Sequence, residues 1–228
     1  MSMFRFNRRG ALIALAALGL SACGGASDTG ETGTTGGAAS SDSVVLQDII
    51  FGDPDAPVTL IEYASWTCPA CLDFHSRIMP TVKSDYIDTG KLRIVFREFP
   101  TAPENVAVAG FALARCANTD DYYDFLDELF TRQDAILTLA RQGGPVVEAL
   151  KQIASNYGIE GDEAFQACLD DAENRAEIRA SITAARSKDV SVTPSLFLNG
   201  ELMDNNVRIS VETFTAALDE ALGETNGE

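Results

Sequence analysis

Apolar residues recur with two different periods along this chain, and the change between the periods divides it into blocks. From about residue 47, short apolar or β-branched runs separated by turns rich in Asp, Gly and Pro predict two strands, the second from Val58 to Ser65. A helix is predicted after Thr67, and Pro80 should end or kink it. The run KLRIVFREF predicts a further strand, which closes this block near residue 100.

The next block, residues 104–187, has helical periodicity and no convincing strand signal. ENVAVAGFALARCA is apolar nearly all round and predicts a buried helix, whereas helices with one apolar stripe are expected after Tyr122 and after Pro145. DEAFQACLDD and NRAEIRASITAAR predict two more helices. Strand signals then return in VSVTPSLFLNGELM, whose Asn-Gly pair predicts a hairpin, and Ser210 is the expected N-cap of a last helix.

Residues 1–22 predict an export signal. The first ten residues carry three arginines and no acid, and the apolar run that follows is too short to span a bilayer as a helix. Such a start before small residues is typical of a signal peptide. The pair Arg8 and Arg9 leaves twin-arginine export open beside the general route.

The end of this signal, LSAC, resembles bacterial lipoprotein precursors, which are cleaved before a cysteine that carries lipid. The resemblance implies a lipid anchor on Cys23, and Gly24 after it implies the outer membrane. The alternative is an ordinary signal peptide cut near Ala22. Residues 24–43 contain no large apolar side chain, so the segment 23–46 is expected to be a flexible linker, as residues 223–228 are expected to be a tail.

Composition and charge narrow the choice of partners. The 228 residues are 46% hydrophobic and 22% charged, which suits one globular domain, or one with an insertion, and a monomer is expected. The formal net charge of −17 becomes −20 once the three signal-peptide arginines are removed, so nucleic acid and anionic lipid are unexpected partners.

The sequence CPAC places Cys68 and Cys71 at a predicted strand-to-helix junction. Because proline is favoured at the first helical position, Pro69 places Cys68 at the N-cap, where the amides of Ala70 and Cys71 and the helix dipole favour a thiolate. A lowered pKa makes Cys68 the attacking or leaving sulfur of thiol–disulfide exchange, and Cys71, one turn deeper, can resolve the mixed disulfide. The pattern therefore predicts a redox pair.

Three other interpretations compete. A c-type haem needs a histidine directly after the second cysteine, where Leu72 stands. Zinc normally takes four ligands, and His75 is the only histidine, so no metal and no cofactor beyond the redox-active disulfide is expected. A purely structural disulfide stays open, although a bridge within one helical turn closes too small a loop to stabilise the fold much.

Two titratable residues flank the pair. Glu62 shares a face of its predicted strand with Leu60 and Ala64, so it lies either beneath the helix, where it could take the proton from Cys71, or at an exposed position. His75 is either a general base or a polar, partly buried helix residue. We favour the second interpretation because the helix terminus already supplies the activation.

The motifs GDPDAPVTLIEY, CPAC, REFP and VTPSLFLNG stand in one order and resemble the DsbA-like branch of the thioredoxin superfamily over residues 47–222. The resemblance implies an α/β thioredoxin fold with an inserted helical domain. Residues 47–103 and 188–222 would form the thioredoxin domain, and residues 104–187 the insertion.

The same resemblance assigns Cys68 as nucleophile, Cys71 as resolving thiol and Glu62 as the buried acid. It also makes Pro194 a cis-proline facing the cysteine pair, so that the Thr193 backbone would pair with an extended client segment. A thiol:disulfide oxidoreductase is implied, acting on the thiols of unfolded exported proteins and reset by a membrane or thiol redox partner. The chain would work on the periplasmic side of the cell envelope.

This sequence departs from the best-known DsbA pattern at two positions. Ala70 stands where a histidine is usual, and Thr193 stands where a valine is usual. The missing histidine removes one stabiliser of the Cys68 thiolate, and threonine before the cis-proline is more like isomerases and reductants. An envelope reductant or isomerase therefore remains an alternative, as does a lipoprotein that uses the scaffold for binding only.

Cys116 and Cys168 fall in two predicted helices of the insertion. They are either buried free thiols or a structural disulfide, and export favours the disulfide.

Overall fold

A computed structural model describes residues 46–117 and 121–223 of the chain. The predicted signal peptide, the Cys23 anchor and nearly all of the linker and tail lie outside the described residues. Across the two described ranges, no helix is long and apolar enough to cross a membrane.

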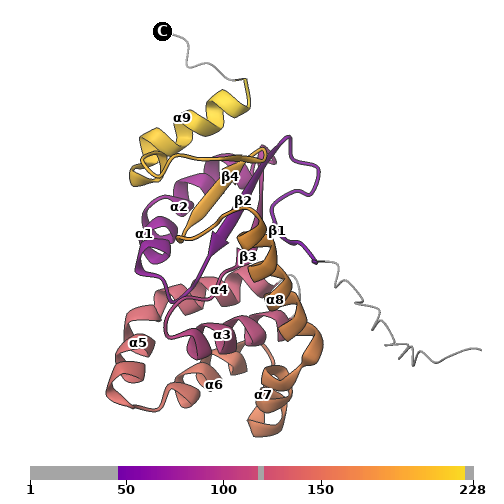
Figure 1. Cartoon of the computed structure of the whole chain (residues 1–228), viewed down its shortest axis with the longest axis vertical. Helices are drawn as coiled ribbons and strands as arrows, with labels where there is room; N and C mark the ends of the chain where they lie inside the picture. Colours follow the sequence, from indigo (N-terminus) through magenta and orange to yellow (C-terminus); the bar gives the residue numbers. More distant parts are fainter. Residues whose placement is uncertain (1–45, 118–120, 224–228) are drawn as a thin grey trace, which may run out of the picture. The chain divides into compact units, whose positions relative to one another are not determined.

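A five-stranded mixed sheet forms the centre of the described fold (Figure 1). Its strands are β1 (Ile49–Phe51), β2 (Val58–Ala64), β3 (Leu92–Glu98), β4 (Ser195–Leu198) and β5 (Glu201–Leu202), in the order β1-β3-β2-β4-β5. β2 and β3 pair in parallel and the other neighbours are antiparallel. The central position of β2 explains its nearly continuous apolar sequence, because helices cover both faces of such a strand.

The predicted hairpin joins β4 to β5. Asn199 and Gly200 both adopt positive φ, at 49° and 92°, as a two-residue turn of the primed type requires. β4 begins only at Ser195, later than the apolar pattern suggests. A proline has no N–H for the ladder, so the strand starts after Pro194.

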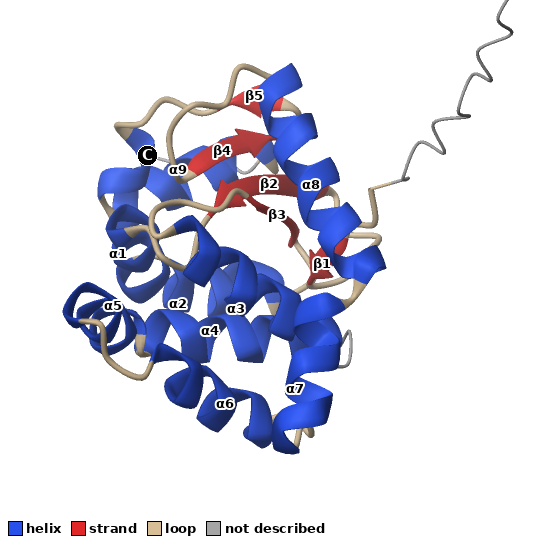
Figure 2. Ribbon diagram, turned by 60° about the horizontal axis from the view of Figure 1, so that its bottom comes forward, coloured by secondary structure: helices blue, strands red, loops and turns tan. Residues whose placement is uncertain are grey.

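Helices cover the two faces of the sheet differently (Figure 2). On one face lie α1 (Pro69–Arg77), α2 (Met79–Val82), the π-helix η1 (Lys83–Ile87) and α9 (Val211–Ala221), and on the other lies α8 (Ala172–Ser187). Ser210 caps α9 as predicted, since its hydroxyl accepts a hydrogen bond from the Thr213 amide at 3.2 Å. The helix is interrupted at Ile78, between α1 and α2 and two residues before Pro80, so the interruption expected from this proline is present.

The helical block lies between β3 and β4 and forms a layer beside the sheet (Figure 1). It contains α3 (Glu104–Cys116), α4 (Tyr122–Thr131), α5 (Gln133–Gln142), α6 (Val146–Asn156) and α7 (Gly161–Asp170), and α8 then returns to the sheet. This architecture agrees with the predicted fold class, an α/β thioredoxin fold with a helical insertion. The sequence patterns did not single out α5 within this block.

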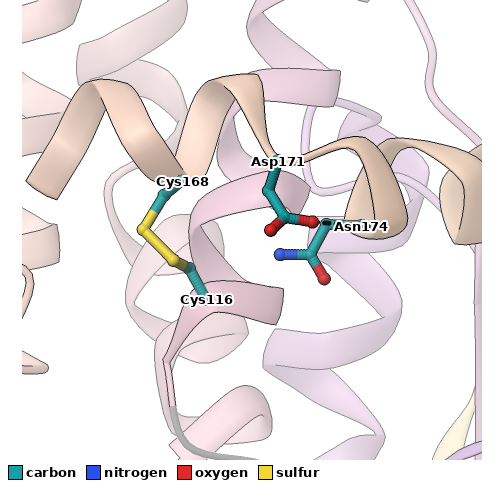
Figure 3. The surroundings of a disulfide bond; sticks show 4 residues. All are labelled: Cys116, Cys168, Asp171 and Asn174. Atoms are coloured by element: carbon teal, nitrogen blue, oxygen red, sulfur yellow. Dashed lines mark hydrogen bonds between the residues drawn. A yellow bond between two sulfur atoms is a disulfide. The ribbon is translucent and has the colours of Figure 1, made fainter.

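A disulfide joins two helices of the insertion (Figure 3). Cys116 ends α3 and Cys168 lies in α7, with their Cα atoms 5.6 Å apart and a sequence separation of 52. Next to the disulfide, the carboxylate of Asp171 accepts a hydrogen bond at 2.7 Å from the backbone N–H of Asn174 and so caps α8. Of the two alternatives for these cysteines, the structure has the disulfide.

Candidate active site

Cys68 occupies the N-cap of α1. Its backbone is extended, with φ −87° and ψ 122°, and Pro69 follows at the first helical position. The Cys68 carbonyl accepts hydrogen bonds at 3.1 Å from the amides of Cys71 and Leu72, which starts the helix. This placement follows from local chemistry, because the fixed φ of proline suits the first turn and its missing N–H costs no helical hydrogen bond.

The Cys68 sulfur lies where hydrogen-bond donors converge. A hydrogen bond from the Cys71 thiol is the main reason that the pKa of Cys68 falls to about 5, and burial opposes it. Hydrogen bonds from the Thr193 side chain and from the amides of Cys71 and Ala70 lower the pKa further. At neutral pH Cys68 is therefore mostly thiolate.

Cys71 has the opposite character. Its side chain is fully buried, and burial raises the pKa of the Cys71 thiol well above its ordinary value. The hydrogen bond to Cys68 and the charges of Cys68 and Glu62 raise it further. The pair thus consists of one ionised sulfur near the surface and one protonated sulfur behind it, with both cysteines reduced.

The loop before β4 faces the pair. The Thr193–Pro194 bond is cis, and the Thr193 carbonyl oxygen lies 3.5 Å from the Cys68 sulfur. Val192, the residue before, is half exposed. The structure therefore places the Thr193 carbonyl, next to the cis bond to Pro194, beside the Cys68 sulfur.

Contacts with the helical insertion hold the active-site loop, and sequence reasoning missed them. The Gln133 side-chain amide donates to the carbonyls of Trp66 and Cys68, at 2.6 and 3.0 Å. Trp66 in turn donates to the Ala107 carbonyl at 2.9 Å, and a Cβ at Gly110 would lie 2.4 Å from its indole nitrogen. No local motif marks Gln133, because its partners are more than 60 residues earlier in the chain.

Strand alternation left Glu62 either buried beneath the helix or exposed, and the structure has it buried in the core. Its side chain is fully buried, and its Oε1 is 3.1 Å from Nε2 of His75. His75 is also buried, and Phe130 stacks on its ring at 4.1 Å between centroids. Sequence reasoning favoured a polar, partly buried helix residue at His75 over a general base, and it missed this pair.

The two residues form an ion pair. Burial alone would lower the pKa of His75, but the charge of Glu62 and hydrogen bonds to Asp127 and Glu62 outweigh it and raise the pKa to about 9. An imidazolium between carboxylates therefore lies behind the resolving cysteine at neutral pH.

Fold and site together define a dithiol protein of the thioredoxin superfamily with an inserted helical layer. A family model described as thioredoxin matches residues 45–220. The chain belongs to this family, in its DsbA-like branch of thiol:disulfide oxidoreductases.

Relatives and solved structures agree with this assignment. The chain is 28% identical over 181 residues to a Rickettsia bellii protein and 31% identical over 179 residues to a Rickettsia conorii protein, each with the provisional name protein-disulfide oxidoreductase. These matches cover 79% and 78% of this chain, and 67% and 61% of the relatives' own lengths.

The crystal structure of alpha-DsbA1 from Wolbachia pipientis aligns with a TM-score of 0.62 and 29% identity, over 79% of this chain and 93% of that one. Oxidised BdbD from Bacillus subtilis aligns with a TM-score of 0.62 over 77% of this chain and 93% of that one, and at 20% identity it shows a likeness of fold alone.

Proposed function

We propose that this protein donates disulfides to the thiols of unfolded proteins outside the cytoplasm. The observation that carries the proposal is the low pKa of Cys68, about 5, which results from donors of Cys71, Thr193 and Ala70 that converge on its sulfur. A thiolate that is stable at neutral pH is a good leaving group, so the oxidised pair is readily reduced by a client.

The reaction proceeds by two exchanges. In the oxidised protein, a client thiolate attacks the Cys68 sulfur, the bond between Cys68 and Cys71 breaks, and Cys71 leaves and takes a proton. A second client thiolate then attacks the client sulfur of the mixed disulfide, and Cys68 leaves as its stable thiolate. Two client thiols lose two electrons to one disulfide of the protein, and a redox partner must afterwards reoxidise the pair.

Client binding uses the loop before β4. The cis bond at Pro194 and the proximity of the Thr193 carbonyl to Cys68 support main-chain pairing of Thr193 with an extended client segment. Half-exposed Val192 offers an apolar contact beside it. Such recognition depends on backbone geometry, which suits clients of many sequences.

Equilibration with glutathione buffers tests the direction of the reaction. We expect a reduction potential for the Cys68–Cys71 pair less negative than about −200 mV. A potential near that of thioredoxin, about −270 mV, would instead favour the reductant that Ala70 and Thr193 keep open.

A trapping experiment tests whether the pair performs exchange at all. Cys71→Ser should accumulate mixed disulfides between Cys68 and reduced, unfolded client proteins, because the resolving sulfur is missing. Cys68→Ser is the matched control and should accumulate none. Equal capture by both variants would favour a binding protein without exchange chemistry.

We further propose that the chain is exported, cleaved before Cys23 and anchored through lipid on that residue, with the outer membrane favoured by Gly24. The linker would then let the folded part reach clients away from the membrane surface. Mass spectrometry of the mature protein should find an acylated Cys23. A mature amino terminus without lipid would contradict the anchor and leave the redox proposal intact.

A further inference from the structure

A cavity of about 720 Å³ lies where α3 packs against α7 and α8. Its lining is mainly apolar, with Val108 and Ala112 from α3, Leu169 from α7, and Ile178 and Ile182 from α8. Ala112 and Ile178 are buried, whereas Val108, Leu169 and Ile182 are half-buried and present apolar surface to solvent. A volume of this size with a mainly apolar lining is typical of binding sites, and the exchange mechanism above does not use it.

One face of α8 joins this cavity to a row of arginines, Arg175, Arg179 and Arg186, which we call the basic face of α8. They recur at positions i, i+4 and i+11, so they lie along the same side of the helix as Ile182. Arg175 and Arg179 line the cavity, and all three arginines are exposed. The carboxylate of the lining, Glu104, lies in the first turn of α3, where it complements the helix dipole.

Most of the charge on the basic face is not paired within the chain. Arg175 donates from Nε to the Leu169 carbonyl at 2.6 Å, and its Nη2 is 3.9 Å from a carboxylate oxygen of Asp170. Among residues 46–117 and 121–223, no ion pair includes Arg179 or Arg186. The whole chain has 34 acidic and 17 basic residues, so an unpaired row of arginines is a local exception to its negative charge. Such a row attracts an acidic partner to one place on the surface.

Both walls of the cavity lead to the redox site. α8 ends one residue after Arg186, and the loop that carries Thr193 beside the Cys68 sulfur follows directly (Figure 1). α3 begins three residues after Thr101, whose hydroxyl oxygen is 2.9 Å from that of Thr67, the residue before Cys68. A few residues therefore separate each wall of the cavity from the surroundings of Cys68.

We propose that the cavity and the basic face of α8 bind an extended client segment that carries apolar and acidic residues near its cysteine. Apolar client side chains enter the cavity beside Val108 and Ile182, and client carboxylates pair with Arg179 and Arg186. This inference rests on the proposed function and deepens it, since it names the clients with which exchange is fastest. Charge pairs at an exposed surface act mainly on the rate of association and on selectivity, so the effect belongs in the kinetics.

A client segment fits these features better than an anionic membrane does. Side chains of an extended chain alternate between two sides, so one side can fill the apolar cavity while the other meets the arginines. The flat surface of a bilayer does not enter a cavity between three helices. The net charge of −17 also opposes approach to an anionic membrane, whereas a short client segment meets only the local charge of α8.

The test uses three synthetic peptides, each with one cysteine flanked on both sides by an alternating pair of residues: Leu and Glu, Leu and Lys, or Ser and Glu. The rate constant for reduction of the Cys68–Cys71 disulfide of the full chain is measured with each peptide. It is divided by the rate with the uncharged disulfide of 2-mercaptoethanol, which corrects for the reactivity of the peptide thiol. The Leu and Glu peptide should be faster than either other peptide by about tenfold at low ionic strength. Its advantage over the Leu and Lys peptide should shrink as salt is added.

Charge reversal on α8 should reverse the preference. Arg179→Glu/Arg186→Glu should react faster with the Leu and Lys peptide than with the Leu and Glu peptide. Arg141→Glu/Arg208→Glu is the matched control, because it changes the net charge equally at two arginines outside α8, and it should keep the wild-type preference. Uncharged dithiothreitol should reduce the redox pair of both variants at the wild-type rate, since neither variant touches Cys68 or Cys71.

Equal corrected rates of the wild type with all three peptides, or the same loss of preference in both variants, would overturn the proposal. Vesicles of equimolar phosphatidylglycerol and phosphatidylcholine test the membrane alternative, with Cys23→Ser as the chain without an anchor. Vesicle binding that Arg179→Glu/Arg186→Glu abolishes, without any peptide preference, would assign the basic face to a membrane instead. A reduction potential near that of thioredoxin would refute disulfide donation without changing the ratio of peptide rates, so the two proposals fail separately.

Discussion

The two cysteine pairs of this protein show that the surroundings of a disulfide decide whether it stabilises the fold or is readily reduced. Cys116 and Cys168 bond across 52 residues and join two helices of the insertion. Cys68 and Cys71 stand one helical turn apart, and a helix N-terminus, a cis-proline and the buried pair of Glu62 and His75 surround them. The first pair closes a long loop, whereas the second closes almost none.

This difference gives the two disulfides opposite effects on stability. A bond that closes a long loop restricts the unfolded chain and stabilises the fold. Within one turn that gain is small, and the fold instead stabilises the reduced pair by holding Cys68 as a thiolate. The Cys116–Cys168 disulfide therefore stabilises the fold, whereas the fold favours reduction of the disulfide between Cys68 and Cys71.

The largest effect on the free energy of unfolding should come from removing the Cys116–Cys168 disulfide. Cys116→Ala/Cys168→Ala should lower the free energy of unfolding by about 4 kcal/mol, as the chain-entropy model gives for a separation of this size. Chemical denaturation measures the loss. The reduction potential of the Cys68–Cys71 pair should stay unchanged in this variant, and a parallel shift of the potential would show that the two pairs are not independent.

A smaller effect on the free energy of unfolding should come from the buried ion pair of His75 and Glu62. Because the pKa of His75 rises from 6.5 to about 9 on folding, its stabilising effect is fully present below about pH 6.5 and is lost as the pH rises through about 9. The difference in unfolding free energy between wild type and His75→Gln should therefore shrink by about 3 kcal/mol across this range. A difference that stays constant with pH would contradict the ion pair with Glu62.

The smallest effect should distinguish the oxidised and reduced forms of the redox pair. At pH 7 the reduced form should be more stable to denaturant by about 2 kcal/mol, because the pKa of Cys68 is lowered from 9 to about 5 on folding. That stabilisation is complete above about pH 9 and is lost as the pH falls through about 5. The Cys116→Ala/Cys168→Ala background removes the second bond from the comparison, and an oxidised form that is the more stable one there would refute the account.

Local patterns in the sequence predicted the parts of the site that depend on neighbouring residues. Proline after Cys68 set the N-cap, alternation along β2 placed Glu62 in one of two environments, and the Asn-Gly pair gave the hairpin after β4. These features follow from the geometry of a few consecutive residues. Resemblance to a known family then supplied the cis bond at Pro194, which spacing alone does not indicate.

The remaining parts depend on contacts between distant segments. His75 meets Glu62 because α1 packs on β2, and Gln133 reaches the Cys68 carbonyl because α5 packs behind the loop. Asp127 approaches His75 from a third element, α4. Helical periodicity predicts which face of each helix is buried, but it does not predict which residues meet across the packed faces.

The central claim is that the Cys68 sulfur is ionised well below the ordinary pH for a thiol. The most direct test is the rate of Cys68 alkylation by iodoacetamide as a function of pH in Cys71→Ala and in the wild-type reduced protein. For the wild type, the account predicts a midpoint near pH 5, with a higher midpoint in Cys71→Ala, because the Cys71 thiol is the strongest donor to the thiolate and alanine has no donor. A wild-type midpoint near 9, the ordinary value for a cysteine, would contradict it.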